Sequence, residues 1–363
     1  MNLQKISISI VLIVAVVGSI VYLNSQKIER VSTGEAVSVT PRLPDESKKD
    51  EITPLIPKSN TYPLAKEITT PDGFINTDGQ PVTIGEFVGK KVVLLDIWTY
   101  SCINCQRTTP YLNAWYEKYK DKGLVIIGLH TPEFEFEKVY QNVLDSTQRL
   151  GIKYPVVLDN DYSTWNAYQN RFWPRKYLID IDGYVIYDHI GEGFYEETEQ
   201  KIQGALAERM AILGESGTIT TTLTKETAVT SGSRSPETYF GSDRNEYLGN
   251  GKKRTAGPQT FALPTLSTLN TLYLGGTWNI QNEYAEAVKD ATVRYRFTGR
   301  HMYVVGSAPM ERSIGVTLDG VRQTSVTVST DRLYTLISLP EAEEHTLELT
   351  VPSGVKFYAF TFG

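Results

Sequence analysis

The sequence predicts an α/β domain built on a mixed sheet with flanking helices, followed by an all-β sandwich of jelly-roll type, behind one N-terminal transmembrane helix. Three observations lead to this architecture. An 18-residue run without a charge stands near the amino terminus, strand-like and helix-like segments alternate over residues 62–213, and short alternating segments without a convincing helix fill residues 236–363. At 363 residues, the chain is long enough for two domains that each have a core.

The uncharged run begins at Ile6 and ends at Leu23. It has about the length that a helix needs to cross a hydrocarbon core, and it is apolar on every face, unlike a helix of a soluble protein. A cleaved signal peptide is the alternative, but residues 17–19 are a poor version of the small-x-small site at which cleavage occurs. We therefore expect a retained transmembrane anchor at residues 6–23, followed by a flexible tether at residues 24–60 that mixes Pro, Ser, Lys, Asp and Glu.

Residues 62–213 alternate between predicted strands and predicted helices and close with a hairpin and a last helix. Alternation with helices requires parallel pairing of the strands, whereas a hairpin must be antiparallel, so a mixed sheet with helices on both faces results. The predicted elements are, in order, a hairpin over 74–84 that turns at Asp78-Gly79, strand 91–98, helix 102–120, strand 124–129, helix 133–150, strand 154–158, helix 163–169, a hairpin of strands 176–181 and 184–190, and helix 196–213.

Beyond this domain the composition changes twice. Residues 214–235 are rich in Thr, Ser and Gly, and we interpret them as a linker. From about Leu272 onward there are eight or nine short alternating segments, for example 293–297 and 325–328, separated by turn pairs such as Asp319-Gly320. This pattern predicts a β-sandwich over residues 236–363.

The composition argues against several classes of function. The formal net charge of −6 is unlike that of a general nucleic-acid binder, which needs a basic surface. The only two cysteines stand three positions apart, so structural disulfides do not hold the domains together. The four histidines are scattered without paired spacing, so the cysteine pair lacks the two further ligands of a zinc site. We expect no metal, and no cofactor beyond the dithiol itself.

The two cysteines lie where a predicted strand ends and a predicted helix begins. A thiol at a helix N-terminus faces unpaired N–H groups and the positive end of the helix dipole, which favour its thiolate form. Cys102 takes this place, so we interpret it as the attacking nucleophile. Cys105 lies one turn further into the helix on the same face, in position to resolve a mixed disulfide by attacking the sulfur of Cys102.

Three further residues make this interpretation more specific. Asp96 lies on the strand beneath the motif among apolar residues, where burial should raise its pKa and let it move the proton of Cys105. Pro110, five positions after Cys105, should kink the helix. Pro174 precedes a predicted strand and fits a cis peptide bond that brings the backbone of Trp173 beside the dithiol.

These positions resemble the thioredoxin fold, which keeps a buried acid, a platform Trp, two redox cysteines, a kink proline and a cis-proline at the same places. The residues that match are Asp96, Trp98, Cys102, Cys105, Pro110 and Pro174. Residues 98–107 resemble more closely the thioredoxin-like part of DipZ-type proteins, which is similar to the extracytoplasmic TlpA-like reductases. Residues 235–241 and 273–278, with Glu283-Tyr284, also resemble DipZ-type proteins, in which a carbohydrate-binding-module-like sandwich follows the thioredoxin-like domain. The resemblance covers residues from about 70 to 363.

The resemblance implies a thiol–disulfide oxidoreductase that has its bulk outside the cytoplasm and reduces disulfides of protein substrates. The apolar run at residues 6–23 adds the expectation that a single pass anchors it in the cell membrane. The residues expected to contact the substrate around the dithiol are Trp98, Ser101, Ile103, Asn104, Trp173 and Pro174. DipZ-type proteins carry a multi-helix, electron-transporting membrane domain, whereas one anchor is predicted here. Electrons are therefore expected from a separate membrane donor of the DsbD/CcdA type. Ser101 stands where thioredoxin has a Trp, so the substrate preference of thioredoxin does not carry over.

One alternative enzyme is a peroxiredoxin-like thiol peroxidase. Thr99 stands three positions before Cys102, as in a PxxxTxxC site, but Leu95 stands where that motif has its proline. A nucleophile with its resolving cysteine three residues away suits protein disulfide exchange better.

An alternative of another class is a glycan-binding surface protein with an accessory redox domain. Its sugar-stacking residues would be exposed aromatics of the sandwich, and the candidates are Tyr273, Trp278 and Tyr284. We expect these aromatics to pack in the core or between the domains instead. Further candidates for the substrate surface are Arg107, Glu133 and Arg175.

Overall fold

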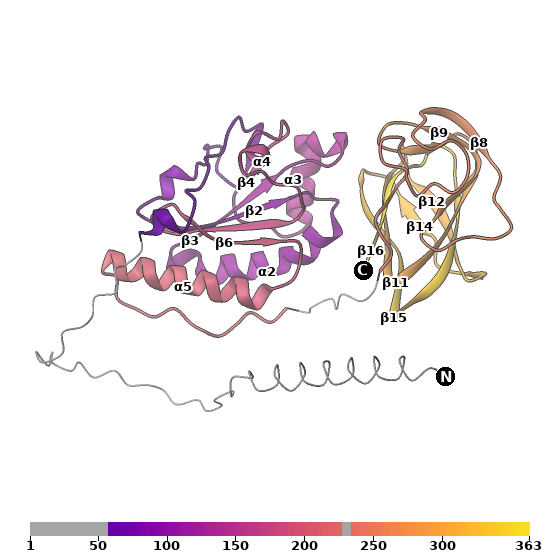
Figure 1. The fold of residues 1–363 in the computed structure, drawn as a ribbon. Coiled ribbons are helices and arrows are strands. Elements are labelled where there is room, and N and C mark those ends of the chain that lie inside the picture. The colour runs from indigo at the N-terminus through magenta and orange to yellow at the C-terminus, as the bar shows by residue number, and fades with distance from the viewer. Residues whose placement is uncertain (1–56, 227–233) are drawn as a thin grey trace, which may run out of the picture. The chain divides into compact units, whose positions relative to one another are not determined.

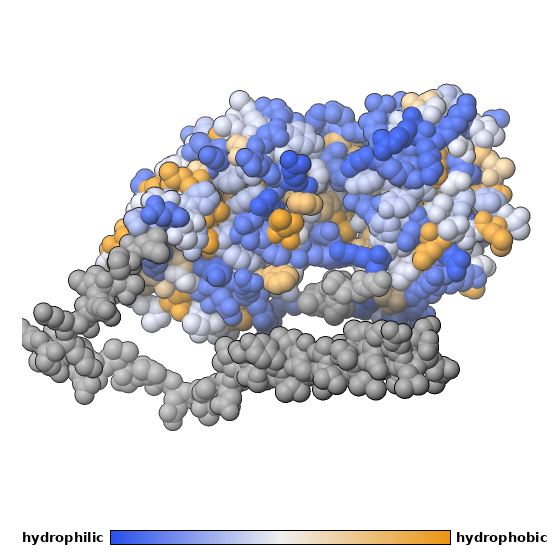
Figure 2. Space-filling view, in the orientation of Figure 1, coloured by the Kyte–Doolittle hydropathy of each residue, from blue (hydrophilic) through white to orange (hydrophobic). Residues whose placement is uncertain are grey.

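The computed structural model describes residues 57–226 and 234–363, which fall within one compact unit, Ile56–Gly363 (Figure 1). The predicted anchor at residues 6–23 and most of the predicted tether lie outside the described residues. Within the described ranges, no helix is both long and apolar enough to cross a membrane. On the face drawn in Figure 2, hydrophilic residues predominate and hydrophobic residues lie in separate small groups.

The first part of the chain folds around a six-stranded mixed sheet with the strand order β1-β4-β3-β2-β5-β6. Strands β2, β3 and β4 pair in parallel, and β1, β5 and β6 join them by antiparallel pairing, as the alternation of elements predicts. The strands are β1 (Gly73–Ile75), β2 (Val92–Trp98), β3 (Leu124–His130), β4 (Val156–Leu158), β5 (Arg175–Ile179) and β6 (Val185–Ile190).

Helices cover both faces of this sheet, which confirms the predicted layers. Helices α2 (Ile103–Tyr119), α3 (Tyr140–Arg149) and α5 (Tyr195–Leu213) contribute to the core on one face, and α2 and α5 run along that face in Figure 1. Helix α4 (Ser163–Ala167) contributes Trp165 to the core on the opposite face. Because side chains alternate along a strand, Leu94, Asp96 and Trp98 of β2 point to the face that α2 covers.

The predicted hairpin over residues 74–84 is wrong. Strand β1 ends at Ile75 and pairs with β4 instead. A turn with positive φ at both residues of Asp78-Gly79 exists, but the chain beyond it forms no strand before β2. In this irregular segment, the side chains of Val82 and Ile84 are buried in the core that contains Trp165. Their apolar alternation therefore reports burial and not strand pairing.

The predicted helix over residues 133–150 is wrong in its first part. The chain there forms a short 3-10 helix, η4 (Glu135–Lys138), and α3 begins only after Val139, whose ψ of 112° is extended. The ring of Phe136 packs against the core that α2 covers, and its centroid also lies 4.7 Å from that of the Tyr358 ring in the C-terminal part of the chain. This tertiary contact overrides the helical spacing.

The C-terminal part is all-β, as predicted, and its named strands pair antiparallel. Ten strands occur in its described residues, and two of them are much longer than predicted, because β11 and β15 continue through register shifts near Gly299–Tyr303. The strands are β7 (Thr238–Tyr239), β8 (Gly257–Phe261), β9 (Leu272–Ile280), β10 (Ala285–Ala287), β11 (Ala291–Ser307), β12 (Arg312–Leu318), β13 (Val321–Arg322), β14 (Val326–Val328), β15 (Arg332–Val351) and β16 (Lys356–Phe362).

The described part of the predicted linker follows α5. Residues 215–226 have no regular structure, but the backbone N–H and the hydroxyl of Thr224 donate to the Glu199 carboxylate at 2.6 and 2.9 Å. The sequence of this segment predicted only a flexible connection.

Candidate functional site

The two cysteines occupy the first turn of α2, directly after the buried strand β2. Cys102 is the N-cap residue of α2, and its Sγ accepts a hydrogen bond from the backbone N–H of Cys105 at 3.4 Å. Both thiols are free; Cys102 is half-buried and Cys105 is 2% exposed. Burial and the hydrogen bond to Cys102 raise the pKa of the Cys105 thiol well above its usual range. Cys102 is thus the accessible sulfur, and Cys105 needs a base before it can react.

Asp96 lies beneath this turn in a buried environment. It is 2% exposed, and burial raises the pKa of its carboxyl to about 6, while the charge of Lys176 opposes this rise. Its Oδ1 has no hydrogen-bond partner among the described residues. The charge of Asp96 contributes to the raised pKa values of Cys105 and Tyr154. The carboxyl therefore lies in the environment that the sequence predicts.

Lys176 is a buried charge that the sequence interpretation missed. It lies opposite Asp96 in the pairing of β2 with β5, is 0% exposed, and points to the same face of the sheet because it shares its parity with the core residue Leu178. Its Nζ donates to the carbonyl of Gly191 at 3.1 Å. Burial lowers the pKa of Lys176, and the Asp96 charge opposes that fall. The sequence signal for this residue was a lysine within a predicted strand of the buried sheet. Because lysine is almost never fully buried unless it is paired, its position there could have indicated a buried acidic partner.

The turn before Cys102 is held by a second buried carboxylate, which the sequence interpretation also missed. Oε1 of Glu137 accepts hydrogen bonds from the Ser101 hydroxyl at 2.7 Å and the Ser101 N–H at 3.2 Å. Oε2 accepts from the backbone N–H groups of Glu133 and Phe134 at 2.6 and 3.0 Å. Glu137 is 0% exposed, and burial raises its pKa against the effect of these donors.

Three residues expected to contact the substrate are instead buried away from the cavity that Cys102 lines: Trp98, Ser101 and Pro174. Ser101 is 1% exposed, and its hydroxyl donates a hydrogen bond to the buried carboxylate of Glu137. Trp98 is 2% exposed, and its ring packs edge-on against His130 with centroids 5.2 Å apart. Trp98 and Ser101 belong to the support of the dithiol and not to its surface, and the prediction is corrected for all three residues.

The loop before β5 lies where the sequence predicts. The Trp173–Pro174 peptide bond is cis. Trp173 is half-buried, and its indole N–H donates to the Thr131 carbonyl at 3.0 Å, while Pro174 is buried. Pro110 lies inside α2, which continues from Ile103 to Tyr119.

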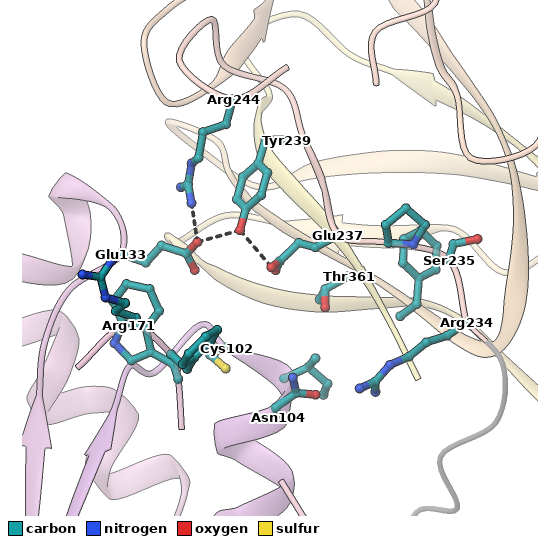
Figure 3. Close-up of a pocket in the computed structure, with 15 residues that line it drawn as sticks. Cys102, Asn104, Glu133, Arg171, Arg234, Ser235, Glu237, Tyr239, Arg244 and Thr361 are labelled. Atoms are coloured by element: carbon teal, nitrogen blue, oxygen red, sulfur yellow. Dashed lines mark hydrogen bonds and ion pairs between the residues drawn. The ribbon is translucent and has the colours of Figure 1, made fainter. Parts of the chain in front are cut away.

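A cavity of about 500 Å³ opens on Cys102 (Figure 3). One side is formed by the first part of the chain and the other by the C-terminal part, beginning with residues 234–237. The lining residues are Cys102, Ile103, Asn104, Glu133, Arg171, Phe172, Trp173, Arg234, Ser235, Pro236, Glu237, Tyr239, Arg244, Thr361 and Phe362. Ile103, Asn104 and Trp173 therefore lie where the sequence predicts a substrate surface. Residues 235–241 resemble DipZ-type proteins, but nothing in that stretch of sequence indicated that it lies beside the dithiol.

Polar contacts connect the two sides of this cavity. Oε1 of Glu133 pairs with Nη1 of Arg244 at 2.7 Å and accepts from the hydroxyl of Tyr239 at 2.8 Å. The Tyr239 hydroxyl also lies 2.8 Å from Oε2 of Glu237, as the dashed lines in Figure 3 show. Of the three candidate surface charges, only Glu133 lines the cavity. Arg107 pairs with Glu192 at 3.3 Å, and Arg175 pairs with Asp188 at 2.6 Å.

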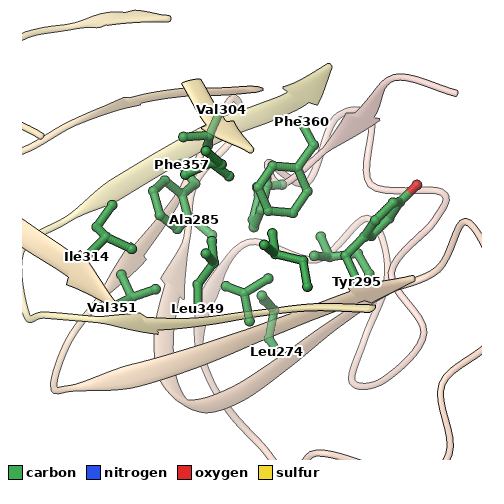
Figure 4. Packing of buried hydrophobic residues seen from close by; sticks show 14 of the residues in the cluster. Leu274, Ala285, Tyr295, Val304, Ile314, Leu349, Val351, Phe357 and Phe360 are labelled. Carbon is green, nitrogen blue, oxygen red and sulfur yellow. The ribbon is translucent and has the colours of Figure 1, made fainter. Parts of the chain in front are cut away.

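The aromatics considered for sugar stacking are mostly buried. Trp278 is 0% exposed, donates its indole N–H to the Gly275 carbonyl at 3.0 Å, and belongs to the hydrophobic core of which Figure 4 shows a part. Tyr273 is 9% exposed. Tyr284 packs against Tyr358 with ring centroids 5.2 Å apart, beside the contact of Phe134 and Phe136 with the same ring. Packing accounts for all three candidates.

The residue that would mark a peroxidase site has another role. The Thr99 hydroxyl lies 3.4 Å from Nε2 of His130, and the N–H of Tyr100 donates to the same nitrogen at 3.3 Å. Burial lowers the pKa of His130 to about 3, so the ring is neutral and accepts these bonds. Within the described ranges, no three His, Cys, Asp or Glu residues come together as a metal site.

Comparisons with known proteins agree with this geometry. The Redoxin family model matches residues 58–206, and the model for a thioredoxin-like C-terminal domain matches residues 235–363. The chain is 36% identical to Protein DipZ of Mycobacterium tuberculosis over 308 residues, which are 84% of this chain and 43% of that protein. It is 33% identical to thiol-disulfide oxidoreductase ResA of Bacillus anthracis over 135 residues, which are 37% of this chain and 72% of ResA. A solved structure, a putative thiol:disulfide interchange protein DsbE from Chlorobium tepidum, is 24% identical and covers 40% of this chain and 96% of its own, with a TM-score of 0.35.

The chain spans less than half the length of the DipZ protein that it matches, but it covers most of ResA. Both family models, the DipZ and ResA similarities and the free cysteine pair at the start of α2 point in one direction. The chain belongs to the thioredoxin-like thiol-disulfide oxidoreductases.

Proposed function

We propose that this chain is an extracytoplasmic enzyme, held in the cell membrane by residues 6–23, that reduces disulfides of protein substrates through Cys102 and Cys105. One observation carries the proposal. The half-buried Cys102 caps α2 and lines a cavity, while the second thiol lies buried directly behind it. This arrangement supplies one sulfur for attack and one for resolution.

The reaction proceeds in two exchanges. The Cys102 thiolate attacks one sulfur of the substrate disulfide, a mixed disulfide forms, and the other substrate sulfur leaves as a thiolate that takes a proton from solvent. The Cys105 thiolate then attacks Sγ of Cys102, which releases the second substrate thiolate. The substrate gains two electrons and two protons in all, and the enzyme is left with a Cys102–Cys105 disulfide.

Asp96 is the proposed base for the second exchange. Burial keeps the Cys105 proton in place until a carboxylate accepts it, and the Asp96 pKa of about 6 leaves this group ionised at neutral pH. The carboxyl contacts neither the cavity nor solvent, so its proton transfer is confined to the buried thiol.

The proposal includes the direction of the exchange: the enzyme reduces its substrates. It also includes the source of the electrons, a separate membrane donor of the DsbD/CcdA type. Each turnover leaves the cysteines oxidised, so a reductant on the same side of the membrane must restore the dithiol. The similarity to thiol-disulfide oxidoreductase ResA supports the exchange reaction itself.

The C-terminal part is proposed as a carbohydrate-binding-module-like, jelly-roll-type sandwich whose role is to wall the active site. The buried positions of Trp278 and Tyr273 support packing over sugar stacking. The engagement of Thr99 with His130 likewise gives no support to a peroxidase.

Trapping with single-cysteine variants tests the roles of the two thiols. Cys105→Ser should accumulate mixed disulfides on Cys102 when incubated with a disulfide-containing protein, and Cys102→Ser should accumulate few. Mass spectrometry after acid quenching reports the attached residue. Adducts mainly on Cys105 in the Cys102→Ser protein would reverse the assignment.

Membrane fractionation tests the anchor. The protein should remain with the membrane after a high-salt wash and leave it only after proteolysis within residues 24–60. A mature chain that begins near Ile20 would show instead that the segment is a cleaved signal.

A further inference from the structure

The cavity beside Cys102 limits what can reach the thiol. Its volume of about 500 Å³ is in the range of sites that hold small ligands or short chain segments. A surface disulfide on a folded domain would have to bring its neighbouring residues into the same space.

The far side of the cavity is held against the thioredoxin-like part by several contacts. Besides the pairing of Glu133 with Arg244, the hydroxyl of Tyr100 donates to the Asp331 carbonyl at 3.2 Å. The backbone N–H of Glu135 donates to Glu283 at 3.0 Å. The apolar contact of Phe134 and Phe136 with Tyr358 adds to these bonds. The wall is therefore part of the site and not a loose neighbour.

Each charged residue that lines the cavity has a polar partner, with one exception. Glu237 bonds with the hydroxyl of Tyr239, and two of the arginines have ion pairs. Arg244 pairs with Glu133 at 2.7 Å, and Arg234 pairs with Glu192 at 2.9 Å. Arg171 is exposed and lines the cavity with Cys102, yet it makes no hydrogen bond, ion pair or ring contact with any residue that the structure describes. A guanidinium offers a planar set of donors that matches a carboxylate.

The residue after Arg171 adds an apolar surface. Phe172 is 50% exposed and lines the same cavity, next to the half-buried Trp173. A ligand that fills the cavity would thus meet an aromatic wall and one unpaired cation beside the reactive sulfur.

We propose that the cavity selects a disulfide carried on a short extended polypeptide segment, and that Arg171 pairs with a carboxylate next to the substrate cysteine. The inference rests on the proposed function, because it concerns the substrate of the same thiol. The exposed Arg171 recognises the acidic side chain, and the limited volume of the cavity excludes disulfides on folded domains.

Synthetic hexapeptides test the charge preference. Each contains one cysteine, linked by a disulfide to 2-mercaptoethanol, and they differ only in Glu, Gln or Lys beside the cysteine. In single-turnover reactions of the reduced full chain, the Glu peptide should react about tenfold faster than the Lys peptide, with the Gln peptide between them. Raising the salt concentration to about 0.5 M should reduce this ratio.

Arg171→Gln should bring the Glu-to-Lys ratio below about twofold, since the cation is gone. The matched control is Arg254→Gln, an arginine of the C-terminal part that pairs with Glu246 away from the cavity and should keep the wild-type ratio. Equal rates for the three peptides in the wild type, or an unchanged ratio in Arg171→Gln, would overturn the assignment of Arg171.

Native insulin, a small folded protein, tests the exclusion of folded substrates. Its disulfides should be reduced at least about tenfold more slowly than the Glu peptide. A rate equal to that of the peptide would refute the size selection. The small neutral disulfide 2-hydroxyethyl disulfide separates the substrate preference from the proposed oxidoreductase activity. If the wild-type protein cannot reduce it, the proposed function itself is refuted.

Discussion

The hydroxyl of Ser101 donates a hydrogen bond to the fully buried carboxylate of Glu137 at 2.7 Å. This bond joins the residue directly before the nucleophile to the segment that carries Phe134 and Phe136. Because those two rings pack against Tyr358, the C-terminal part of the chain is connected to the turn that presents Cys102. A single buried carboxylate therefore couples the wall of the site to its reactive residue.

Removing this bond should loosen the turn. We expect Ser101→Ala to lower the free energy of unfolding by about 1–3 kcal/mol, because a buried acceptor loses its partner. Glu137→Gln should cost more, since its amide N–H₂ would face backbone N–H donors at one of the two oxygen positions. Urea denaturation measures both, and alkylation of Cys102 reports the turn. Ser313→Ala, at an exposed position of β12, is the matched control; an equal loss of stability there would contradict the role of the buried bond.

The pH dependence of resolution should report Asp96. The Cys105 proton is accepted only by the ionised carboxylate, so release of the substrate from the mixed disulfide should slow as the pH falls through about 6. Asp96→Asn should slow this step at neutral pH and remove its dependence on pH near 6. Rapid-quench measurement of the mixed disulfide gives the rate. A wild-type profile with no inflection between pH 5 and 7 would exclude this carboxyl as the base.

Lys176→Met should move that inflection upward. The ammonium group lowers the pKa of Asp96, and its loss leaves desolvation unopposed. A shift of about one pH unit or more is expected in the same rapid-quench assay. Lys118→Met is the control, because this lysine pairs with Glu199 elsewhere on the domain and should leave the inflection in place. An unshifted profile in Lys176→Met would mean that the buried lysine serves packing alone.

Asp96 should also affect stability, with a definite sign. Its folded-state pKa is raised, so the destabilising effect of the buried carboxylate is absent below the unfolded pKa near 4 and complete above about 6. At pH 7.5, Asp96→Asn should therefore raise the free energy of unfolding by about 2 kcal/mol, provided that the amide fits the same space. Denaturation at pH 5 and 7.5 should show the gain shrinking at the lower pH. A gain that grows as the pH falls would contradict the raised pKa.

The contacts around Tyr239 should make access to Cys102 depend on pH. A phenol has one proton and can donate to only one of two carboxylates, so when Tyr239 donates to Glu133, its contact with Glu237 needs a proton on Glu237. Glu237 is partly exposed, but desolvation by the residues around it and the charge of Glu133 raise the pKa of its carboxyl to about 7. The hydrogen bond from Tyr239 and the charges of Arg244 and Arg234 lower that pKa. Protonation stabilises this bridge below that pH, and the stabilisation is lost as the pH rises through it.

The measurable outcome is a ratio of alkylation rates in a Cys105→Ser background. The rate for a bulky maleimide divided by that for iodoacetamide should rise several-fold between about pH 5.5 and 8.5, since the wall loosens while ionisation of Cys102 affects both reagents. Glu237→Gln, which keeps a neutral donor, should hold the ratio low at every pH. Glu246→Gln, whose carboxylate pairs with Arg254, should behave as the parent protein does. A ratio that stays constant with pH in the parent would contradict the shared proton.

Trp278 separates packing from sugar binding. It is fully buried, so Trp278→Ala should lower the free energy of unfolding by about 3–5 kcal/mol. Tyr247→Ala, at a 40% exposed position of the same domain, should change it by about 0.5 kcal/mol or less. Glycan binding that is lost in a stably folded Trp278→Ala protein would contradict the packing role.

The sequence by itself determined the parts of the fold that depend on local pattern. Apolar runs of strand length predicted β2 and β3, and a cysteine pair directly after such a run predicted the dithiol at the start of α2. The aspartate among apolar residues of β2 was equally readable, because burial of a charge in a strand is costly unless it serves a purpose. These features follow from neighbours in the chain.

Tertiary structure alone decided which distant residues complete the site. Glu137 and Lys176 are ordinary charged residues in the sequence, and only the packing of η4 and β5 buries them beneath the dithiol. The first part of the helix predicted over residues 133–150 was wrong for the same reason, since Phe136 packs against Tyr358, more than two hundred positions away. The wall at residues 234–237 overlaps the stretch that resembles DipZ-type proteins, but its local sequence does not reveal that it lies beside Cys102. A side chain's environment depends on long-range contacts, and the free energy of those contacts outweighs the weak preferences of the local sequence.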